Sequence, residues 1–160
     1  MTAVGGALLG CASLLLLKCY SSYVAARRDE CLGFLSLLRE LERGMSLYLD
    51  APRLAVTRHK SDALERLGFL ERLRDGATLA EAFMSVEGSL AMPPEAKRIL
   101  TEYFSRLGGG YLDGELRALS RAISELEPIA KKESDDAVKR IKVAGVLIFS
   151  VTAGALILLL

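Results

Sequence analysis

The last 18 residues of the chain, Val143 to Leu160, contain no charged side chain. They read VAGVLIFSVTAGALILLL, and a helix of that length extends about 27 Å, close to the thickness of the hydrocarbon core of a bilayer. A buried core helix of a soluble protein is the alternative, but this segment is apolar on every face. We therefore expect residues 143–160 to form a C-terminal transmembrane helix.

The N-terminal residues 1–26 form a second apolar stretch, which contains one charge, Lys18. A lysine at that position can extend to the lipid headgroups, and Tyr20 and Tyr23 can anchor the helix at the interface. A cleaved signal peptide is the competing interpretation, but it would have positive charge ahead of its apolar run. No such charge precedes Lys18, so we expect a retained transmembrane helix.

The basic residues next to both apolar stretches lie on the central side. The positive-inside rule therefore places residues 27–142 in the cytoplasm and both ends of the chain outside, as a multi-pass protein of the cell membrane. This middle part contains 20 basic and 20 acidic residues, so it lacks the excess of positive charge that a nucleic-acid surface needs. The flanking basic residues are Lys18, Arg27, Arg28, Lys131, Lys132, Lys139, Arg140 and Lys142.

The middle part has the residue spacing of amphipathic helices. From Asp29 to Leu49, apolar residues recur every three or four positions and define one helix face. A second such stripe precedes the C-terminal apolar segment, and no β-type alternation persists. We therefore expect an all-α fold, with a small helical bundle in residues 27–142 between two transmembrane helices. The stripes consist of Cys31, Leu35, Leu38, Leu41, Met45 and Tyr48, and of Leu116, Leu119, Ile123, Leu126 and Ala130.

Two glycine-containing corners separate predicted helices. Gly76 would end one helix, and Thr78 with Glu81 has the spacing of a capping box at the start of the next. In LGGGYLDGEL (residues 107–116), one glycine would end a helix and the aspartate would cap another. The stretch has neither the Lys-Ser or Lys-Thr of a Walker loop nor the third glycine of GxGxxG. The predicted corner residues are Gly76, Thr78, Glu81, Gly108, Gly110, Asp113, Gly114 and Leu116.

Residues suited to catalysis or metal binding are few. The spacing of Cys11, Cys19 and Cys31 matches no zinc or redox motif, so we expect free thiols. The single histidine, His59, lies among charged neighbours and is expected at the surface, which leaves neither a Ser-His-Asp site nor a histidine-rich metal site. The acidic residues alternate with lysines and are expected on solvated helix faces, including Glu125, Glu127 and the run Glu133–Asp136. We expect no enzyme activity, no cofactor and no metal.

Small residues recur at four-residue spacing in both apolar segments. This spacing lets two helices approach closely in lipid. It predicts packing between the two spans of one chain or between neighbouring copies, so a homo-oligomer is one arrangement that the pattern permits. The pairs are Gly6 with Gly10, and Ser150 with Gly154.

The stretch GATLAEA, Gly76 to Ala82, resembles the G-x-S/T-L-x-E-A element of the platform protein family of type II secretion systems and type IV pili. Further along its chain, that family has G-E-x-S-G-x-L at the start of a long helix that leads to a membrane span. Here GYLDGEL (residues 110–116) keeps both glycines and the final leucine at matching spacing. It has Tyr111 in place of the glutamate and Asp113 in place of the serine. The family has two such cytoplasmic bundles, whereas this chain has room for one.

A single bundle with a membrane span at each end is similar to the stage III sporulation protein AB family of endospore-forming bacteria. The layout covers the whole chain, and the sequence-specific part covers Gly76 to Leu126. Members of that family usually have a lysine close to the initiator methionine, which the opening MTAVGG lacks. The resemblance implies a non-enzymatic scaffold in the mother-cell membrane around the forespore, as part of a secretion-like channel complex. It also implies that the bundle recruits the cognate secretion-type ATPase and contacts other membrane components of the complex.

Two other functions stay open on the sequence. One is a general assembly platform of the type II secretion or type IV pilus kind, outside sporulation. The other is a membrane-tethered enzyme, which would need a pair of reactive groups that we do not find in the sequence. All three hypotheses share membrane lipid as a partner and exclude nucleic acid.

Overall fold

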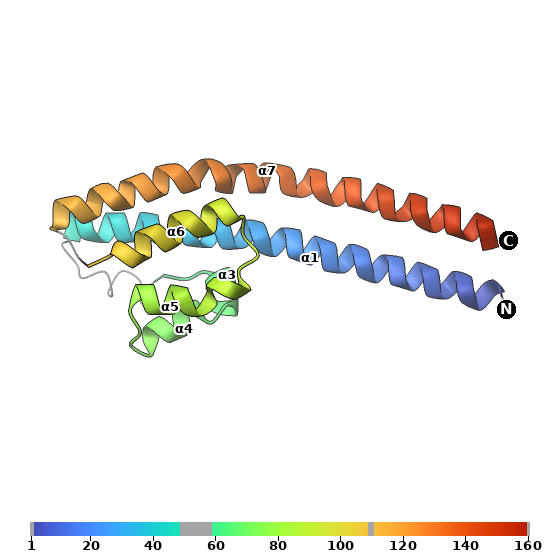
Figure 1. The fold of residues 1–160 in the computed structure, drawn as a ribbon, viewed down its shortest axis with the longest axis horizontal. Helices are drawn as coiled ribbons and strands as arrows, with labels where there is room; N and C mark the ends of the chain where they lie inside the picture. Colours follow the sequence, from blue (N-terminus) through green and yellow to red (C-terminus); the bar gives the residue numbers. More distant parts are fainter. Residues whose placement is uncertain (1, 49–58, 109–110, 160) are drawn as a thin grey trace. The chain divides into compact units, whose positions relative to one another are not determined.

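The computed structural model describes residues 2–48, 59–108 and 111–159, and every regular element in them is helical (Figure 1). This confirms the all-α prediction. The two longest elements are α1 (Thr2–Arg43) and α7 (Leu112–Leu159). Between them lie, in chain order, the π-helix η1 (Gly44–Tyr48), α3 (Asp62–Arg66), α4 (Phe69–Arg74), α5 (Leu79–Val86), the 3-10 helix η2 (Glu87–Ser89) and α6 (Pro94–Arg106).

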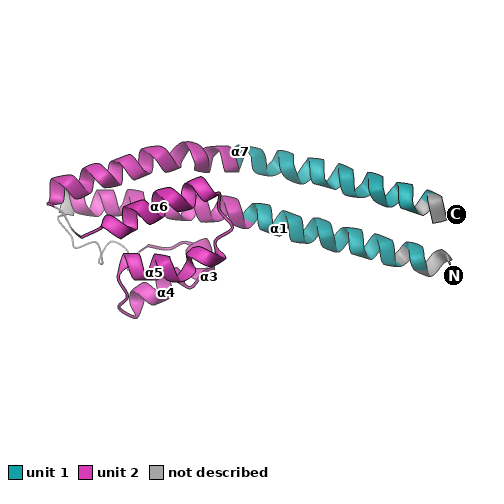
Figure 2. Cartoon of the chain, viewed as in Figure 1, with its two compact units in different colours: residues 1–25, 134–160 teal, residues 26–133 magenta. Residues whose placement is uncertain are grey.

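The chain divides into two compact units (Figure 2). One unit is residues 26–133, and the other pairs residues 1–25 with residues 134–160. Both α1 and α7 therefore contribute to both units. The membrane boundaries expected after residues 26 and 142 stay predictions, because packing alone does not place a membrane.

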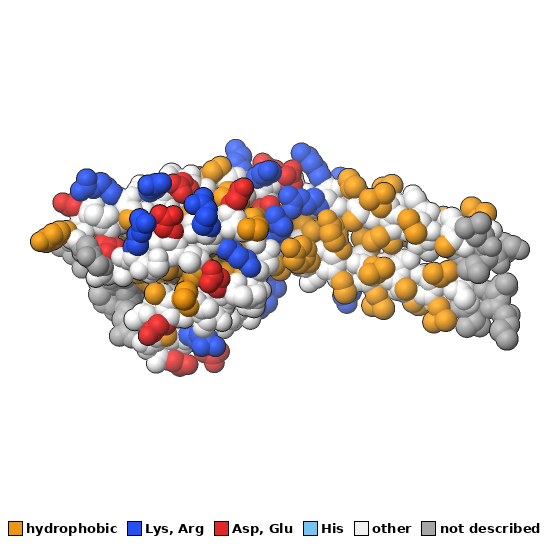
Figure 3. Space-filling view, in the orientation of Figure 1, with side chains coloured by type: hydrophobic (Ala, Val, Ile, Leu, Met, Phe, Trp, Pro, Cys, Tyr) orange, Lys and Arg blue, Asp and Glu red, His pale blue; other side chains and the backbone are white. Residues whose placement is uncertain are grey.

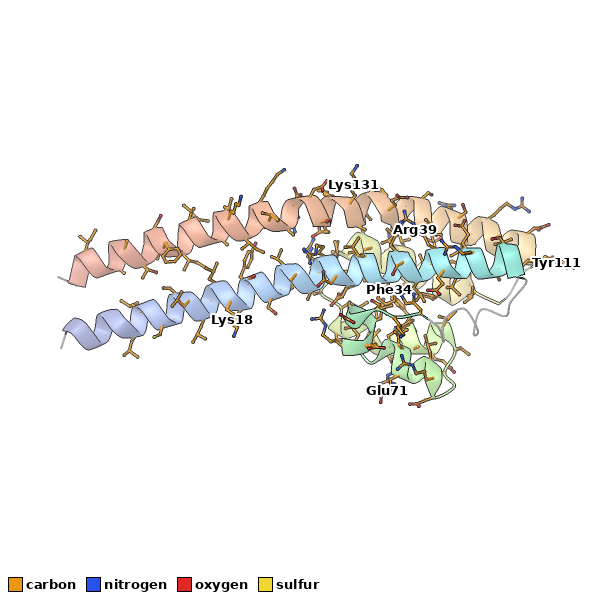
Figure 4. All side chains as sticks on the ribbon, turned by 180° about the vertical axis from the view of Figure 1, so that it is seen from behind. Lys18, Phe34, Arg39, Glu71, Tyr111 and Lys131 are labelled. Atoms are coloured by element: carbon orange, nitrogen blue, oxygen red, sulfur yellow. The ribbon has the colours of Figure 1, made fainter. Side chains whose placement is uncertain are left out.

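Four phenylalanines form the centre of the core in residues 26–133. The ring of Phe34 in α1 meets the rings of Phe69 in α4 and Phe83 in α5 edge-on, at centroid distances of 5.2 and 5.7 Å. Phe104 of α6 lies 5.1 Å from Phe83 and 6.4 Å from Phe34. Figure 4 shows Phe34 pointing from α1 towards the short helices. Because edge-to-face pairs are the favoured aromatic geometry, this cluster orients α4, α5 and α6 on α1.

Both predicted apolar stripes face this core. In the first stripe every residue with a described side chain is buried, and the side chain of Tyr48 lies outside the described part. In the second stripe Leu116 is partly buried and the other members are buried. The buried members are Cys31, Leu35, Leu38, Leu41 and Met45 in α1, and Leu119, Ile123, Leu126 and Ala130 in α7.

The unit of residues 1–25 and 134–160 has the opposite distribution of side chains. Most of its large apolar residues are exposed, as Figure 3 shows over both helical segments, although Val24 is buried. Between the two segments, the hydroxyl oxygens of Ser13 and Thr152 lie 2.6 Å apart and share a hydrogen bond. Lys18 is exposed, on the side of α1 turned away from the paired segment (Figure 4). The outward apolar residues, 59% to 73% exposed, are Leu8, Leu14, Leu15, Leu16, Val143, Val146, Leu147, Phe149, Val151 and Ile157.

One helical segment among the described residues, Leu8–Ser46, is long and apolar enough to cross a membrane. Only 6% of its most apolar 18-residue window is buried, which distinguishes that window from the core part of α1. The criterion uses length and composition, and a signal sequence also meets it. The same criterion does not select the C-terminal segment among the described residues. The side chains of residues 156 and 158–160 lie outside the described part. The C-terminal span stays a prediction.

Candidate functional site

The first predicted corner begins with a glycine at the end of α4. Gly76 has a φ of 103°, in the left-handed region that a residue without a Cβ enters at little cost. Its N–H donates to the carbonyl of Leu73, and the N–H of Ala77 donates to the carbonyl of Arg72. These two bonds form a Schellman motif, which satisfies carbonyl groups at the end of the helix.

The capping box expected after Gly76 is also present. Thr78 Oγ1 accepts a hydrogen bond from the Glu81 N–H at 3.2 Å, and Glu81 Oε2 accepts one from the Thr78 N–H at 2.8 Å. The bonds from Thr78 favour the ionised carboxylate and hold the pKa of Glu81 below its usual value. The corner therefore sets where α4 ends and α5 begins.

The second corner differs from the prediction at Asp113. The structure starts α7 at Leu112, and the Tyr111 carbonyl accepts hydrogen bonds from the N–H groups of Gly114 and Glu115. A carbonyl that accepts the first helical bonds belongs to the cap position, so Tyr111 holds that position. Asp113 lies inside the first turn, where a carboxylate is stabilised by the helix dipole. The prediction of an Asp113 cap is wrong.

The glycines of the second corner have different roles. Gly108 follows the end of α6 with a φ of 91°, as expected for a glycine that ends a helix. Gly114 lies within α7, and a Cβ built on it would meet no atom within 4 Å. It is therefore not a corner residue, contrary to the prediction. Gly110 lies outside the described residues.

Replacing Gly108 with alanine is expected to destabilise the bundle, whereas Gly114→Ala is expected to stabilise it. At the left-handed φ of Gly108, an alanine costs about 1–2 kcal/mol. In the open helical position of Gly114, an alanine gains up to about 1 kcal/mol. Chemical unfolding of the full chain in detergent micelles, followed by circular dichroism, measures both changes. Shifts of the same sign would contradict these assignments.

The small-residue packing predicted in the apolar segments is not the contact between the two segments of one chain. A Cβ built on Gly10 or Gly154 would meet no atom within 4 Å, and Ser150 is exposed. The close approach lies elsewhere, where the Leu17 side chain is 3.9 Å from the Cβ position of Gly145. The prediction that Gly10, Ser150 and Gly154 pack between the two segments of one chain is therefore wrong. Packing of Gly6, Gly10, Ser150 and Gly154 against a neighbouring copy stays a prediction.

A buried ion pair joins α1 to α7 in residues 26–133. The Arg27 guanidinium donates to both carboxylate oxygens of Glu133, from Nε at 2.8 Å and from Nη2 at 3.1 Å. The Glu133 side chain is 6% exposed, so the expectation of a solvated position is wrong for this residue. Two parallel bonds of this kind fix the register of the two helices.

A second buried carboxylate, Glu30, holds the chain ahead of α6. Its Oε2 accepts hydrogen bonds from the backbone N–H groups of Ala91 and Met92, at 2.7 and 3.0 Å. Burial raises the pKa of Glu30, and these two N–H groups partly oppose the rise. The carboxylate thus gives two backbone donors a partner and ties their segment to α1.

Cys31 is expected to resist alkylation in the folded chain. It lies outside the predicted span, is fully buried, and burial beside Glu133 and Glu30 raises its pKa from 9.0 to about 12. Only the thiolate reacts, so between pH 9 and 12 the unfolded chain is reactive and the folded chain is not. Ionisation of the unfolded state also lowers stability as the pH rises through that window.

Iodoacetamide labelling of the Cys11→Ser, Cys19→Ser chain, with and without denaturant, tests this expectation by mass spectrometry. We expect labelling of native Cys31 to be at least about a hundredfold slower than labelling of the denatured chain. Equal rates at pH 9 would contradict the buried, neutral thiol.

His59 is buried, whereas the sequence led us to expect a solvated residue. Its Nδ1 lies 2.5 Å from Glu40 Oε2, and its Nε2 lies 3.4 Å from Ser36 Oγ. Ser36 and Glu40 are one turn apart on α1, so both side chains reach the same ring. The i, i+4 spacing of Ser36 and Glu40 indicates that both side chains could contact one common partner. Nothing in the neighbouring sequence identifies His59 as that partner.

The cluster has the residue types of a catalytic triad but not its geometry. The Ser36 hydroxyl donates to the Gly33 carbonyl at 2.8 Å and therefore does not donate to His59. Ser36 also lies inside α1, where backbone N–H groups are used in helical bonds and cannot stabilise an oxyanion. Among the described residues no three His, Cys, Asp or Glu side chains group as metal ligands. The contacts of His59 with Ser36 and Glu40 therefore attach the segment before α3 to α1.

The corners and polar clusters thus hold the helices of residues 26–133 together. No protein-family model, no curated protein and no solved structure matches this chain. The interpretation as a platform-like protein rests on the GATLAEA and GYLDGEL stretches and on the layout.

The surface feature that sequence reasoning missed is a groove of about 690 Å³ between α6 and α7. The sequence predicts the core stripe of α7, but the groove forms only where α7 meets α6. The hydroxyl of Tyr103 is buried there without a hydrogen-bond partner among the described residues. Burial raises its pKa, and the negative charge of Glu115 adds to the rise. The groove is lined by Ile99, Glu102, Tyr103, Ser105, Arg106, Gly114, Glu115, Arg117, Ala118, Arg121, Ala122 and Glu125.

Proposed function

We propose that this protein is a non-enzymatic membrane scaffold of a secretion-like channel complex between mother cell and forespore. In this proposal the apolar segments hold it in the mother-cell membrane, and the helical bundle lies in the cytoplasm. The bundle recruits the cognate ATPase and links it to the membrane components of the complex.

The observation that carries the membrane role is the reversed side-chain distribution of residues 1–25 and 134–160. Large apolar side chains such as Leu16 and Phe149 are exposed there, whereas the hydroxyls of Ser13 and Thr152 meet between the helices. In water this arrangement leaves apolar surface unburied, which is unfavourable. In lipid the apolar side chains contact acyl chains, and helices associate through small and hydroxyl residues. The arrangement therefore favours a membrane hairpin.

Two features favour a scaffold over the alternatives. The bundle has its own core, with Phe34 at the centre, so it can present surfaces without a second domain. The membrane-tethered enzyme would need a reactive pair, and the Ser36, His59 and Glu40 geometry disfavours one. The general secretion or pilus platform shares the same support, and partner selectivity separates it from the sporulation role.

Topology is tested by cysteine labelling in a cysteine-free chain. Native Cys31 is unsuitable because it is buried on whichever side of the membrane the bundle lies. In intact vegetative cells that express the chain in the plasma membrane, we expect an impermeant maleimide to label Thr2→Cys and to label Arg72→Cys, at an exposed position of α4, only after permeabilisation. The reverse pattern would contradict the proposed orientation. Loss of the chain from the membrane fraction in alkaline carbonate would contradict the membrane role.

Recruitment is tested with the full chain in nanodiscs and purified secretion-type ATPases. We expect capture of the ATPase from a sporulation complex, and no capture of an unrelated P-loop ATPase. Preferential capture of a pilus or type II secretion ATPase would favour the general platform. Capture of none would remove the recruiting role.

A further inference from the structure

The unit formed by residues 1–25 and 134–160 has more basic than acidic side chains, and all of them lie towards one end of it. We propose that its lysines form a belt that binds the headgroups of anionic phospholipids. The belt consists of Lys18 on α1 and of Lys139 and Lys142 on α7. The inference rests on the membrane hairpin of the proposed function, and it adds which class of lipid the hairpin selects.

Contacts between the two segments place Lys18 of α1 level with Lys142 of α7. The Leu17 side chain lies 3.9 Å from the Cβ position of Gly145. Lys18 is one residue from Leu17, and Lys142 is three residues from Gly145, both towards the charged end of the unit. At about 1.5 Å per residue, the two lysines lie less than one helical turn apart along the hairpin. Lys18 is therefore at the edge of the apolar surface and not at its middle.

The charges nearest to the apolar surface are basic. The acidic residues in the sequence of this unit are Asp135 and Asp136, which precede Lys142 by about 10 Å of helix. Asp136 already lies 3.9 Å from each of two basic neighbours. Among the described residues no carboxylate lies within 4.0 Å of Lys18 or Lys142, and both side chains are exposed. The phosphate of a lipid headgroup can supply the negative charge that these two lysines lack.

Exposed apolar side chains lie directly beside these lysines. Leu14 is one turn before Lys18, Val146 is one turn after Lys142, and both are exposed. Figure 3 shows the apolar surface continuing from there along both helical segments. A phospholipid has the same order of chemistry, with a charged headgroup next to its acyl chains. One lipid molecule can therefore contact a lysine with its phosphate and the neighbouring apolar residues with its acyl chains.

The level of the lysines favours lipid over an acidic helix of a partner protein. An ion pair between helices inside the membrane requires a lysine within the hydrocarbon, whereas Lys18 lies level with Lys142, the last charged residue of α7. Lys18 also points away from α7, so it does not form a single pocket with the lysines of that helix (Figure 4). Separate cations match lipid headgroups, which surround a membrane protein on all sides. The headgroups then meet α1 at Lys18, before the boundary expected after residue 26.

Quenching of a single tryptophan by brominated lipids tests the proposal. The chain contains no tryptophan, so Leu14→Trp places one reporter beside Lys18, and Ile157→Trp places a control reporter at the other end of the hairpin. Each full chain is reconstituted in vesicles of phosphatidylcholine with brominated phosphatidylglycerol or brominated phosphatidylcholine. The quenching gives the relative binding constant of the two lipids. We expect phosphatidylglycerol to bind at least about threefold more tightly beside Leu14→Trp and to show no preference at Ile157→Trp.

Charge variants of the Leu14→Trp chain assign the preference to the belt. Lys18→Gln is expected to reduce the preference by about twofold or more, whereas Lys18→Arg keeps the charge and should keep the preference. Lys18→Gln with Lys142→Gln should bring the relative binding constant close to one. Lys60→Gln, at an exposed position of residues 26–133, is the matched control and should leave it unchanged. About 1 M salt should weaken the preference by screening the lysines, and circular dichroism verifies that each variant is folded.

Equal binding of the two lipids beside Lys18 would overturn the proposal and leave a carboxylate of a partner helix as the counter-charge of Lys18. A preference that Lys18→Gln with Lys142→Gln leaves unchanged, or an equal preference at Ile157→Trp, would also overturn it. Quenching of neither reporter by any brominated lipid would refute the membrane hairpin and with it the proposed function. Quenching of both reporters without an anionic preference would refute the belt and leave the membrane role standing.

Discussion

Phe34→Ala is expected to lower the unfolding free energy of the bundle by about 3–5 kcal/mol. The Phe34 ring is fully buried and contacts the rings of Phe69, Phe83 and Phe104, which come from three other helices. Alanine leaves a cavity at the one point where these helices meet, and it removes several aromatic pairs at once. The loss is comparable to the total stability of many small domains. We therefore expect a large shift of the unfolding midpoint, measured by circular dichroism in detergent micelles.

The control for this change is on the same helix. Leu32 is exposed, two positions before Phe34, so Leu32→Ala alters helix propensity little and removes no core contact. We expect its midpoint to stay close to that of the unchanged chain. Phe34→Leu, which keeps much of the volume, should fall between the two. Equal midpoints for Phe34→Ala and Leu32→Ala would mean that the aromatic cluster does not organise the core.

Glu133→Ala is expected to cost about 3 kcal/mol, because it leaves the partly buried Arg27 guanidinium without its bidentate partner. The unfolding midpoint, followed by circular dichroism in detergent micelles, measures this loss of stability. The matched control is Glu127→Ala, which removes an ion pair to Arg39 whose two side chains are 50% and 53% exposed. An exposed pair of this kind contributes about 1 kcal/mol or less.

A double replacement separates loss of the pair from loss of packing. Arg27→Met with Glu133→Leu removes both charges and keeps apolar volume at both positions. Stability should recover towards the starting value, since the desolvation of two charges is no longer required. A double variant as unstable as Glu133→Ala would show that the pair contributes more than its burial costs.

Local features of the fold were predictable from the sequence. The spacing of Leu35, Leu38 and Leu41 identified the buried face of α1, since a helix repeats its face every three to four residues. The Thr78 and Glu81 capping box was predictable for the same reason, because all its bonds lie within one turn. In both cases the structure depends on neighbours in the chain.

The errors concern residues whose partners are distant in the sequence. His59 and Glu133 have charged neighbours in the chain, yet each is buried against α1 through a partner 19 or 106 positions away. The error at Asp113 has a different cause: the helix begins two residues earlier than a cap at Asp113 would place it, because the Tyr111 carbonyl accepts the first helical bonds. The groove between α6 and α7 was not predictable for the same physical reason, since it exists only when two helices meet.

The Arg27–Glu133 ion pair has a consequence for the order of assembly. Its residues are 106 positions apart, and contacts between distant residues form late because they require ordering of the intervening chain. On the ribosome, α1 emerges first and its Phe34 face can meet α4, α5 and α6 while α7 is still being synthesised. Until α7 arrives, the core that contains Leu38 and Leu41 lacks the buried residues of α7, such as Leu126. A chain stalled before α7 is therefore expected to be the form that chaperones and proteases recognise.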